Sequence, residues 1–262
     1  MKKYFLISQT VFKEYFTYRL NFILWRLRNL VSLFIPIFLW QAVLTKNQSL
    51  QNQTLTYFLI IHLVSSLIAS STTSEIASII QNGEIINLLL KPVSFFKYYF
   101  FRDLADKTLN FSFAIFEVLI VAWLIKFSFF SFIHFNIYKV IIFIYFLTLA
   151  LFLNFFVSML LSFIGFISPE VWAPRFIFMI LLQVASGLFI PLDFLPKPIF
   201  NTLIFTPFFY FFYLPTKIIV SNQLNFDINL AIFSGGFWVL IFFIILKFSF
   251  QKGLKTFSFW GK

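Results

Sequence analysis

The sequence contains no cysteine among its 262 residues. A disulfide framework, a thiolate metal site and a cysteine nucleophile are therefore excluded. Charged side chains are also scarce, because they make up 11% of the chain, against about 25% in an ordinary soluble domain. A chain of this size has too few polar residues to cover a hydrophobic core, so much of its apolar surface must face lipid.

Several catalytic motifs are missing as well. The chain has no G-x-x-x-x-G-K-[ST] sequence, so it has no P-loop with which to bind nucleotide phosphates. It also lacks the H-E-x-x-H motif of zinc proteases and the G-x-S-x-G motif of serine hydrolases. The nine acidic residues are too few for a proton pump with many buried carboxylates. We therefore expect no enzymatic activity, no catalytic residue, no bound metal and no cofactor of the chain's own.

What the chain has in abundance is apolar sequence. Hydrophobic residues make up 61% of it, and the mean hydropathy is +0.93. A bilayer core of about 30 Å is crossed by about 20 helical residues. The apolar blocks predict a single all-α, polytopic membrane domain over residues 1–262 with six transmembrane helices, at about 22–44, 55–71, 108–127, 138–163, 175–190 and 230–248.

Charge places these spans relative to the membrane. With six spans and the N-terminus inside, fifteen of the 20 Lys and Arg residues fall on the cytoplasmic side and five outside. We therefore expect a multi-pass protein of the plasma membrane with both termini in the cytoplasm. The net charge of +11 follows from this bias, and nothing in the sequence indicates nucleic-acid binding. The basic C-terminal tail is expected to contact anionic membrane lipid.

The chain begins with an amphipathic segment at 4–18, which we expect to lie along the membrane surface as an interfacial helix rather than to act as a cleavable signal peptide. Lys13 and Glu14 would be costly inside a span. Arg26 and Arg28, in the opening turns of the first span, are expected to extend back to the lipid headgroups.

The longest polar stretch, between the second and third spans, predicts a cytoplasmic region of two short helices at 72–92. Thr72 and Glu75 have capping-box spacing, and Asn82-Gly83 is a strong helix stop. The second helix ends before Pro92, because the residue before proline avoids the α conformation. The candidate partner-binding residues of the whole region are two acidic side chains, an apolar stripe and the glycine hinge. They are Glu75, Ile76, Ile79, Ile80, Gly83 and Glu84.

Two titratable residues fall inside predicted spans. Glu117 lies near the middle of the third span, where a carboxylate marks either a transport pathway or gate, or a buried structural partner, and both readings stay open. His62 in the second span has no Glu or His three or four residues later. A packed or interfacial histidine is therefore favoured over a metal ligand.

Five prolines interrupt the apolar sequence after the fifth span. This stretch is either a seventh span at 199–220 or a re-entrant helical hairpin at about 191–216. A seventh span would place the lysine-rich tail outside, against the charge bias, so we favour the hairpin. Its irregular backbone must be covered by protein, because lipid cannot satisfy it. Gly187, Pro191 and Pro196 are further candidates for a gate.

Three stretches together resemble the ABC-2-type permeases, the membrane subunits of bacterial ATP-binding-cassette exporters, in the branch with chains about as long as this one. They are KEYFTYRLNFILWRL at 13–27, NGEIINLLLKPVS at 82–94, and the SGLFIPLDFLP start of a longer stretch at 186–218. Each motif alone is weak evidence for the family. The order and spacing of the three motifs relative to the six predicted spans make the resemblance specific.

The resemblance implies a role and partners for the chain. The helices at 72–92 would be the coupling region that docks on a separate P-loop ATPase subunit, which binds the ATP. A second permease subunit, either a copy of this chain or a related paralogue, would complete the pathway. An ATP-independent channel or scaffold subunit is the alternative, and the transported substrate stays open.

Overall fold

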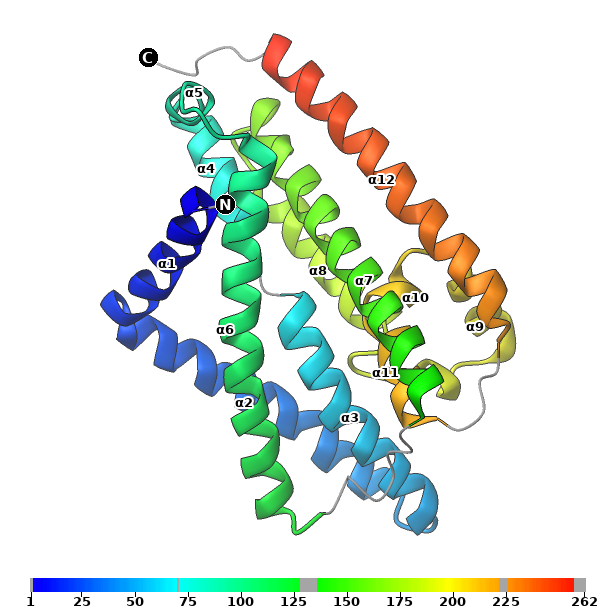
Figure 1. Cartoon of the computed structure of the whole chain (residues 1–262). Helices are drawn as coiled ribbons and strands as arrows, with labels where there is room; N and C mark the ends of the chain where they lie inside the picture. The colour runs from blue at the N-terminus through cyan, green and yellow to red at the C-terminus, as the bar shows by residue number, and fades with distance from the viewer. Residues whose placement is uncertain (1, 70, 128–135, 222–225, 257–262) are drawn as a thin grey trace.

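The computed structural model describes residues 2–69, 71–127, 136–221 and 226–256, and its regular structure in these ranges is helical, without a strand. The predicted all-α class is confirmed. Figure 1 shows α1 (Lys2–Thr17) and α2 (Arg19–Val43) as a V beside the long upright helix α6 (Phe95–Leu124). On the other side, α7 (Ile137–Phe163) runs along α12 (Ile228–Thr256).

Shorter elements connect these helices. The chain passes from α2 through α3 to the two short helices α4 and α5, which lie at the same end of the molecule as the last turns of α12 (Figure 1). After α7, the helix α8 is followed by a broken segment that packs between α3, α7 and α8. The bounds are α3 (Gln48–Ile68), η1 (Thr72–Ser74), α4 (Glu75–Gln81), α5 (Ile85–Leu89), η3 (Ile164–Phe166), α8 (Trp172–Ala185), η4 (Leu192–Phe194), α9 (Lys197–Ile204), α10 (Phe208–Phe211) and α11 (Tyr213–Val220).

Length and composition support fewer spans than predicted. Within the described ranges, four helices are long and apolar enough to cross a membrane: α2, α6, α7 (with η3) and α12. A fifth span is reached when α3 is joined to the bent segment after it. The predicted fifth span corresponds to α8, whose 14 residues extend about 21 Å, short of a bilayer core of about 30 Å. The six-span count is therefore not confirmed.

Two boundaries differ from expectation for clear physical reasons. The third predicted span was placed at 108–127, but α6 already begins at Phe95, so the charged residues from Arg102 to Lys107 belong to a continuous helix. Arg102 pairs with acidic residues of α1 and α4, and Lys107 pairs with Asp103 of its own helix at 2.8 Å. A seventh span at 199–220 is wrong, because the helix stops at Phe205, Pro207 follows, and only short helices continue.

Local sequence explains where the helices begin and end. Asn47 and Asn136 cap α3 and α7, since each side-chain oxygen accepts a bond from a backbone N–H in the first turn. Gly83 adopts φ +77°, which separates α4 from α5. Pro36 lies inside α2 and removes a backbone donor there.

The core is built around α7, which contacts α3, α4, α10, α11 and α12. A main hydrophobic cluster joins α3 and α7 to the aromatic run Phe209–Leu214, which is almost wholly buried. A second cluster lies below α4 and α5, at the ends of α6, α7 and α12. Residues 206–220 are thus covered by protein, as expected for a hairpin, whereas most of residues 193–202 are exposed. The re-entrant position of this segment in the membrane stays a prediction.

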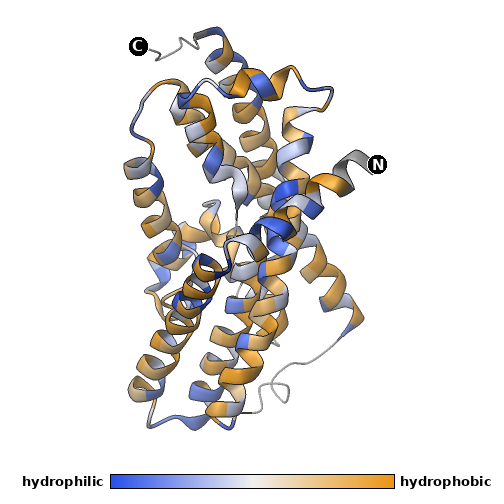
Figure 2. Cartoon of the chain, turned by 90° about the vertical axis from the view of Figure 1, so that its left-hand side faces the viewer, coloured by the Kyte–Doolittle hydropathy of each residue, from blue (hydrophilic) through white to orange (hydrophobic). Residues whose placement is uncertain are grey.

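The outer surface is strongly apolar. Figure 2 shows the long helices mostly in the hydrophobic colour, with hydrophilic residues concentrated at turns, at helix ends and in patches along the helices. Exposed large side chains include Trp123 on α6, Phe176 on α8 and Phe233 on α12. Helices with such outer faces require lipid or a partner around them.

Candidate functional site

The predicted two-helix region at 72–92 is present, but its cap differs from the prediction. The Ser71 hydroxyl, not Thr72, accepts the backbone N–H of Thr73 at 3.3 Å and starts the 3-10 turn η1. The Thr72 hydroxyl is buried and makes no hydrogen bond to any residue that the structure describes. Glu75 then opens α4, so the expected capping box between Thr72 and Glu75 is wrong.

The apolar stripe of α4 turns inward. Ile76 and Ile80 are fully buried against the chain's own membrane helices, in the cluster with Met159 of α7. Docking to a partner would require both side chains to leave this core, and their predicted part in docking stays a prediction. Gly165 fixes the same contact, since a Cβ at this position would lie 3.1 Å from the Ala77 carbonyl oxygen. α4 is thus firmly attached to the membrane helices.

The outward apolar side chains belong to α5 and the residue that follows it. Ile86, Leu89 and Leu90 are 46%, 43% and 79% exposed. Glu84 is also exposed, and Ile79 is half-buried. These residues, together with Asn87 and Leu88, form what we call the α5 surface. The sequence could have indicated this surface, because IINLLL, which Lys91 and Pro92 follow, has more apolar residues than the inward face of so short a helix needs.

Beside the α5 surface lies an open cleft of about 300 Å³. It is bounded by α4, α5 and the first turns of α6. Its walls carry both charge signs and two tyrosines, and consist of Glu75, Ile79, Glu84, Asn87, Leu88, Lys91, Tyr98, Tyr99 and Arg102. Three of the predicted coupling residues, Glu75, Ile79 and Glu84, are therefore brought together at one place.

Arg102 of α6 connects three helices at the base of this cleft. Its Nη2 lies 2.8 Å from Glu14 Oε2 of α1, and its Nε lies 3.1 Å from Glu75 Oε1 of α4. Burial raises the pKa of the Glu75 carboxyl above its ordinary value, and the Arg102 guanidinium offsets part of that rise. The two ion pairs of Arg102 thus connect α4 directly to α1 and α6.

A buried polar network continues from this point toward the middle of the helices. Tyr15 of α1 donates a hydrogen bond to the Asp106 carboxylate, and Asn110 donates to the Tyr15 hydroxyl at 3.3 Å. Arg26 of α2 donates to the Asn110 side-chain oxygen at 3.1 Å. The polar side chains on one face of α6 thereby find hydrogen-bond partners on α1 and α2.

Glu117 completes the network. Its Oε1 lies 2.6 Å from Arg26 Nη2, and its Oε2 lies 2.9 Å from His62 Nε2 of α3. Arg26 therefore does not extend to the headgroups as expected, but is buried and paired with a carboxylate. Of the two readings of Glu117, the geometry matches the buried structural partner, which joins α2, α3 and α6. His62 is packed, and its partner comes from another helix rather than from its own.

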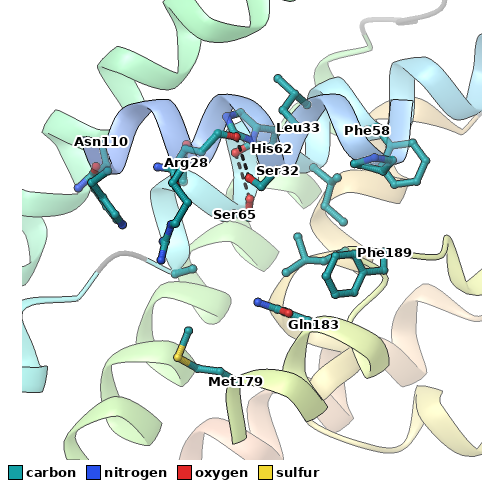
Figure 3. A pocket seen from close by; sticks show the side chains of 17 residues that line it. Arg28, Ser32, Leu33, Phe58, His62, Ser65, Asn110, Met179, Gln183 and Phe189 are labelled. Carbon is teal, nitrogen blue, oxygen red and sulfur yellow. Dashed lines mark hydrogen bonds between the residues drawn. The ribbon is translucent and has the colours of Figure 1, made fainter. Parts of the chain in front are cut away.

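A cavity of about 270 Å³ opens beside this network, between α2, α3 and α8. Figure 3 shows Arg28 and Ser32 on α2 lying across from Met179 and Gln183 on α8, with His62 and Ser65 on the α3 wall. His62 and Asn110 belong both to the cavity lining and to the network. Glu117 does not line the cavity.

Two of the three predicted gate residues after α8, Gly187 and Pro191, lie in a tightly packed turn. Gly187 has φ +82°, and its carbonyl oxygen accepts a hydrogen bond from the Tyr57 hydroxyl at 2.9 Å. Pro191 is buried beside it, whereas Pro196 is exposed at the start of α9. Asp193 fastens the segment, because it accepts a bond from the Tyr213 hydroxyl and pairs with Lys217 at 2.7 Å.

Some other predictions lie outside this geometry. Among the described residues, no three His, Asp or Glu side chains gather closely enough to hold a metal ion. His134, in the predicted outer loop, lies outside the described residues. Arg102, Asp106 and Asn110 were not predicted as functional, although their four-residue spacing along FRDLADKTLN marks one polar face of a helix.

The helical architecture, the apolar outer faces and the helices of membrane-crossing length define a multi-pass membrane protein. Residues 30–261 match the family model described as ABC-2 family transporter protein. The chain therefore belongs to the ABC-2 transporter family, and is a membrane permease component of an ABC transporter. No curated protein sequence matches the chain.

Proposed function

We propose that this chain is the permease subunit of an exporter that is driven by a separate P-loop ATPase. The family membership and the missing P-loop support this division of labour, because the energy source must be supplied by another chain. Two permease subunits, identical or paralogous, would enclose the transport pathway in the plasma membrane. The N-terminus, α4–α5 and the C-terminal tail would face the cytoplasm.

The observation that carries the proposal is the two-sided arrangement of α4 and α5. One side is buried against the membrane helices through Ile76 and Ile80, and the other presents the α5 surface. An amphipathic helix with exposed Leu and Ile side chains fits a groove on a partner. The ATPase would therefore bind the α5 surface, while the buried isoleucines transmit its movement.

Transmission into the membrane would follow the ion pairs of Arg102. Closure of the ATPase subunits on ATP would move α4, and Arg102 would carry this displacement to α1 and α6. From α1 and α6 the buried network continues to Arg26 of α2 and His62 of α3, at the edge of the cavity. Movement at the cytoplasmic end would thus alter the helices around the cavity, which supports alternating access.

The docking prediction is tested by adding charge to the α5 surface. In the Ile86→Asp/Leu89→Asp double variant, co-purification with the cognate ATPase is expected to fall at least about tenfold, because each buried Leu or Ile contributes about 1.5–3 kcal/mol. ATP-dependent transport should fall in parallel. The thermal unfolding midpoint should hardly change, since both side chains are exposed.

The matched control is Asn47→Asp, which adds a negative charge at the exposed cap of α3 and preserves capping. It should leave ATPase binding and transport unchanged. Normal ATPase binding by the double variant would refute the docking surface, and transport without any ATPase would favour the channel alternative.

A further inference from the structure

The cavity between α2, α3 and α8 has an unusual distribution of charge. Its lining contains two basic residues, Arg28 and His62, and no acidic one. His62 is already paired with Glu117, at 2.9 Å. Arg28 forms no ion pair among the described residues, and its guanidinium lies 5.8 Å from the centre of the Trp25 ring. The charge available to a ligand is therefore positive.

Neutral polar groups surround this cation. The side chains of Asn29 and Gln183 make no hydrogen bond within the described part of the chain. Ser32 and Ser65 donate to backbone carbonyls of their own helices, which leaves their oxygens able to accept. In Figure 3, Arg28 and Gln183 project into the space between α2 and α8 from opposite walls. An anionic or hydroxylated headgroup would find donors on both sides.

Most of the remaining lining is apolar. Its aromatic and aliphatic side chains include Leu33, Phe58, Ile61, Leu188 and Phe189. A cavity of about 270 Å³ is close to the lower end of small-molecule sites, which begin at about 300 Å³. It accommodates a headgroup and part of an apolar body, not a bulky polymer.

We propose that this cavity binds an anionic amphiphile, with its phosphate, sulfate or carboxylate group at Arg28 and Gln183 and its apolar part against Phe58 and Phe189. The proposal rests on the function proposed above, because it names the substrate class of that permease. Arg28 is exposed, so its guanidinium is accessible to a ligand, and hydrogen bonds between a guanidinium and an anionic group are among the strong ones. A cationic amphiphile would meet Arg28 without any carboxylate to compensate.

The test uses the full chain in a neutral maltoside detergent, without the ATPase. Binding of decyl phosphate and of decyltrimethylammonium is measured by calorimetric titration against protein-free micelles. The wild-type protein should bind decyl phosphate at least about tenfold more tightly than the cation, because hydrogen bonds to charged groups are the strong ones. Equal binding of the two amphiphiles would overturn the proposal.

Variants assign the selectivity to the cavity. Arg28→Gln should weaken decyl phosphate binding at least about tenfold, and Arg28→Lys, which keeps the charge, should weaken it less. Arg19→Gln removes the same charge from an exposed position of the same helix that does not line the cavity, so binding should be unchanged. Unchanged binding by Arg28→Gln would refute the site.

Gln183→Leu probes the opposite wall and decides the matter should Arg28→Gln fail to fold. It should weaken decyl phosphate binding while the protein elutes as a single symmetrical peak, and wild-type affinity in this variant would contradict the assignment. Its ATPase co-purification should be normal. A wild-type protein that binds decyl phosphate but does not bind an ATPase subunit would refute the proposed function. That result would leave the assignment of the cavity standing.

Reconstitution of the full chain in a membrane separates two sources of the anion. Phosphatidylglycerol and phosphatidylcholine are compared as competitors of decyl phosphate in lipid nanodiscs. Competition by phosphatidylglycerol alone supports an anionic membrane lipid as the occupant, whereas competition by neither lipid supports an amphiphile that enters from water. Equal competition by both lipids would show that charge does not select the ligand, and would overturn the proposal.

Discussion

Replacing Glu117 with leucine is expected to lower the free energy of unfolding by about 3–5 kcal/mol, because it leaves the buried Arg26 guanidinium without its carboxylate. His62 loses its partner in the same variant. The measurement is reversible unfolding in mixed detergent micelles, followed by tryptophan fluorescence. This cost is large because an uncompensated charge at this depth cannot be solvated.

A double variant distinguishes a structural ion pair from a transport residue. In Arg26→Met/Glu117→Leu the unpaired charge is removed, so most of the lost stability should return, and the protein should again assemble with its ATPase. If Glu117→Leu is as stable as the wild-type protein but fails to transport, Glu117 belongs to the pathway instead. That result would contradict the role that the geometry supports.

Gly187→Ala is expected to lower the free energy of unfolding by about 2–5 kcal/mol. Its φ of +82° disfavours any L-residue by about 1–2 kcal/mol. A Cβ would also lie 2.5 Å from the Tyr57 hydroxyl oxygen and 3.2 Å from the Tyr213 ring. Relief of this clash would break the buried Tyr57 hydrogen bond, which adds about 1–3 kcal/mol.

Gly236→Ala is the control for this prediction. Gly236 lies within α12, and the nearest atom to an added Cβ is the Tyr145 hydroxyl oxygen at 3.9 Å. Alanine in a helix interior is favoured over glycine by roughly 0.5–1 kcal/mol, so this variant should be slightly more stable. Equal effects of the two substitutions in thermal unfolding would refute the tight turn after α8.

The sequence predicted the helical class and the positions of most long helices, because apolar blocks of membrane length carry a strong signal. Proline and glycine spacing also predicted the break after Gly83 and the short helices of residues 191–220. The length of α8 was overestimated, because the apolar residues after Ala185 continue in an irregular turn rather than in a helix. Hydropathy alone does not distinguish the two.

The partners of charged residues could not be predicted in the same way. Arg26 and Glu117 are 91 positions apart along the chain, and their pairing depends on how α2 packs against α6. The burial of Ile76 and Ile80 likewise depends on α7, so a stripe that reads as a docking face is in fact a core contact. Helical periodicity identified a face of α4, but not what that face contacts.

The most direct test of ATPase docking on the α5 surface is site-specific photocrosslinking in native membranes. Because the chain has no cysteine, Leu89→Cys and Asn47→Cys each create a single attachment site for benzophenone maleimide. Illumination should join the permease to its ATPase subunit from Leu89→Cys and not from Asn47→Cys, at the exposed cap of α3. Absence of the adduct from Leu89→Cys, or equal adducts from both positions, would contradict the account.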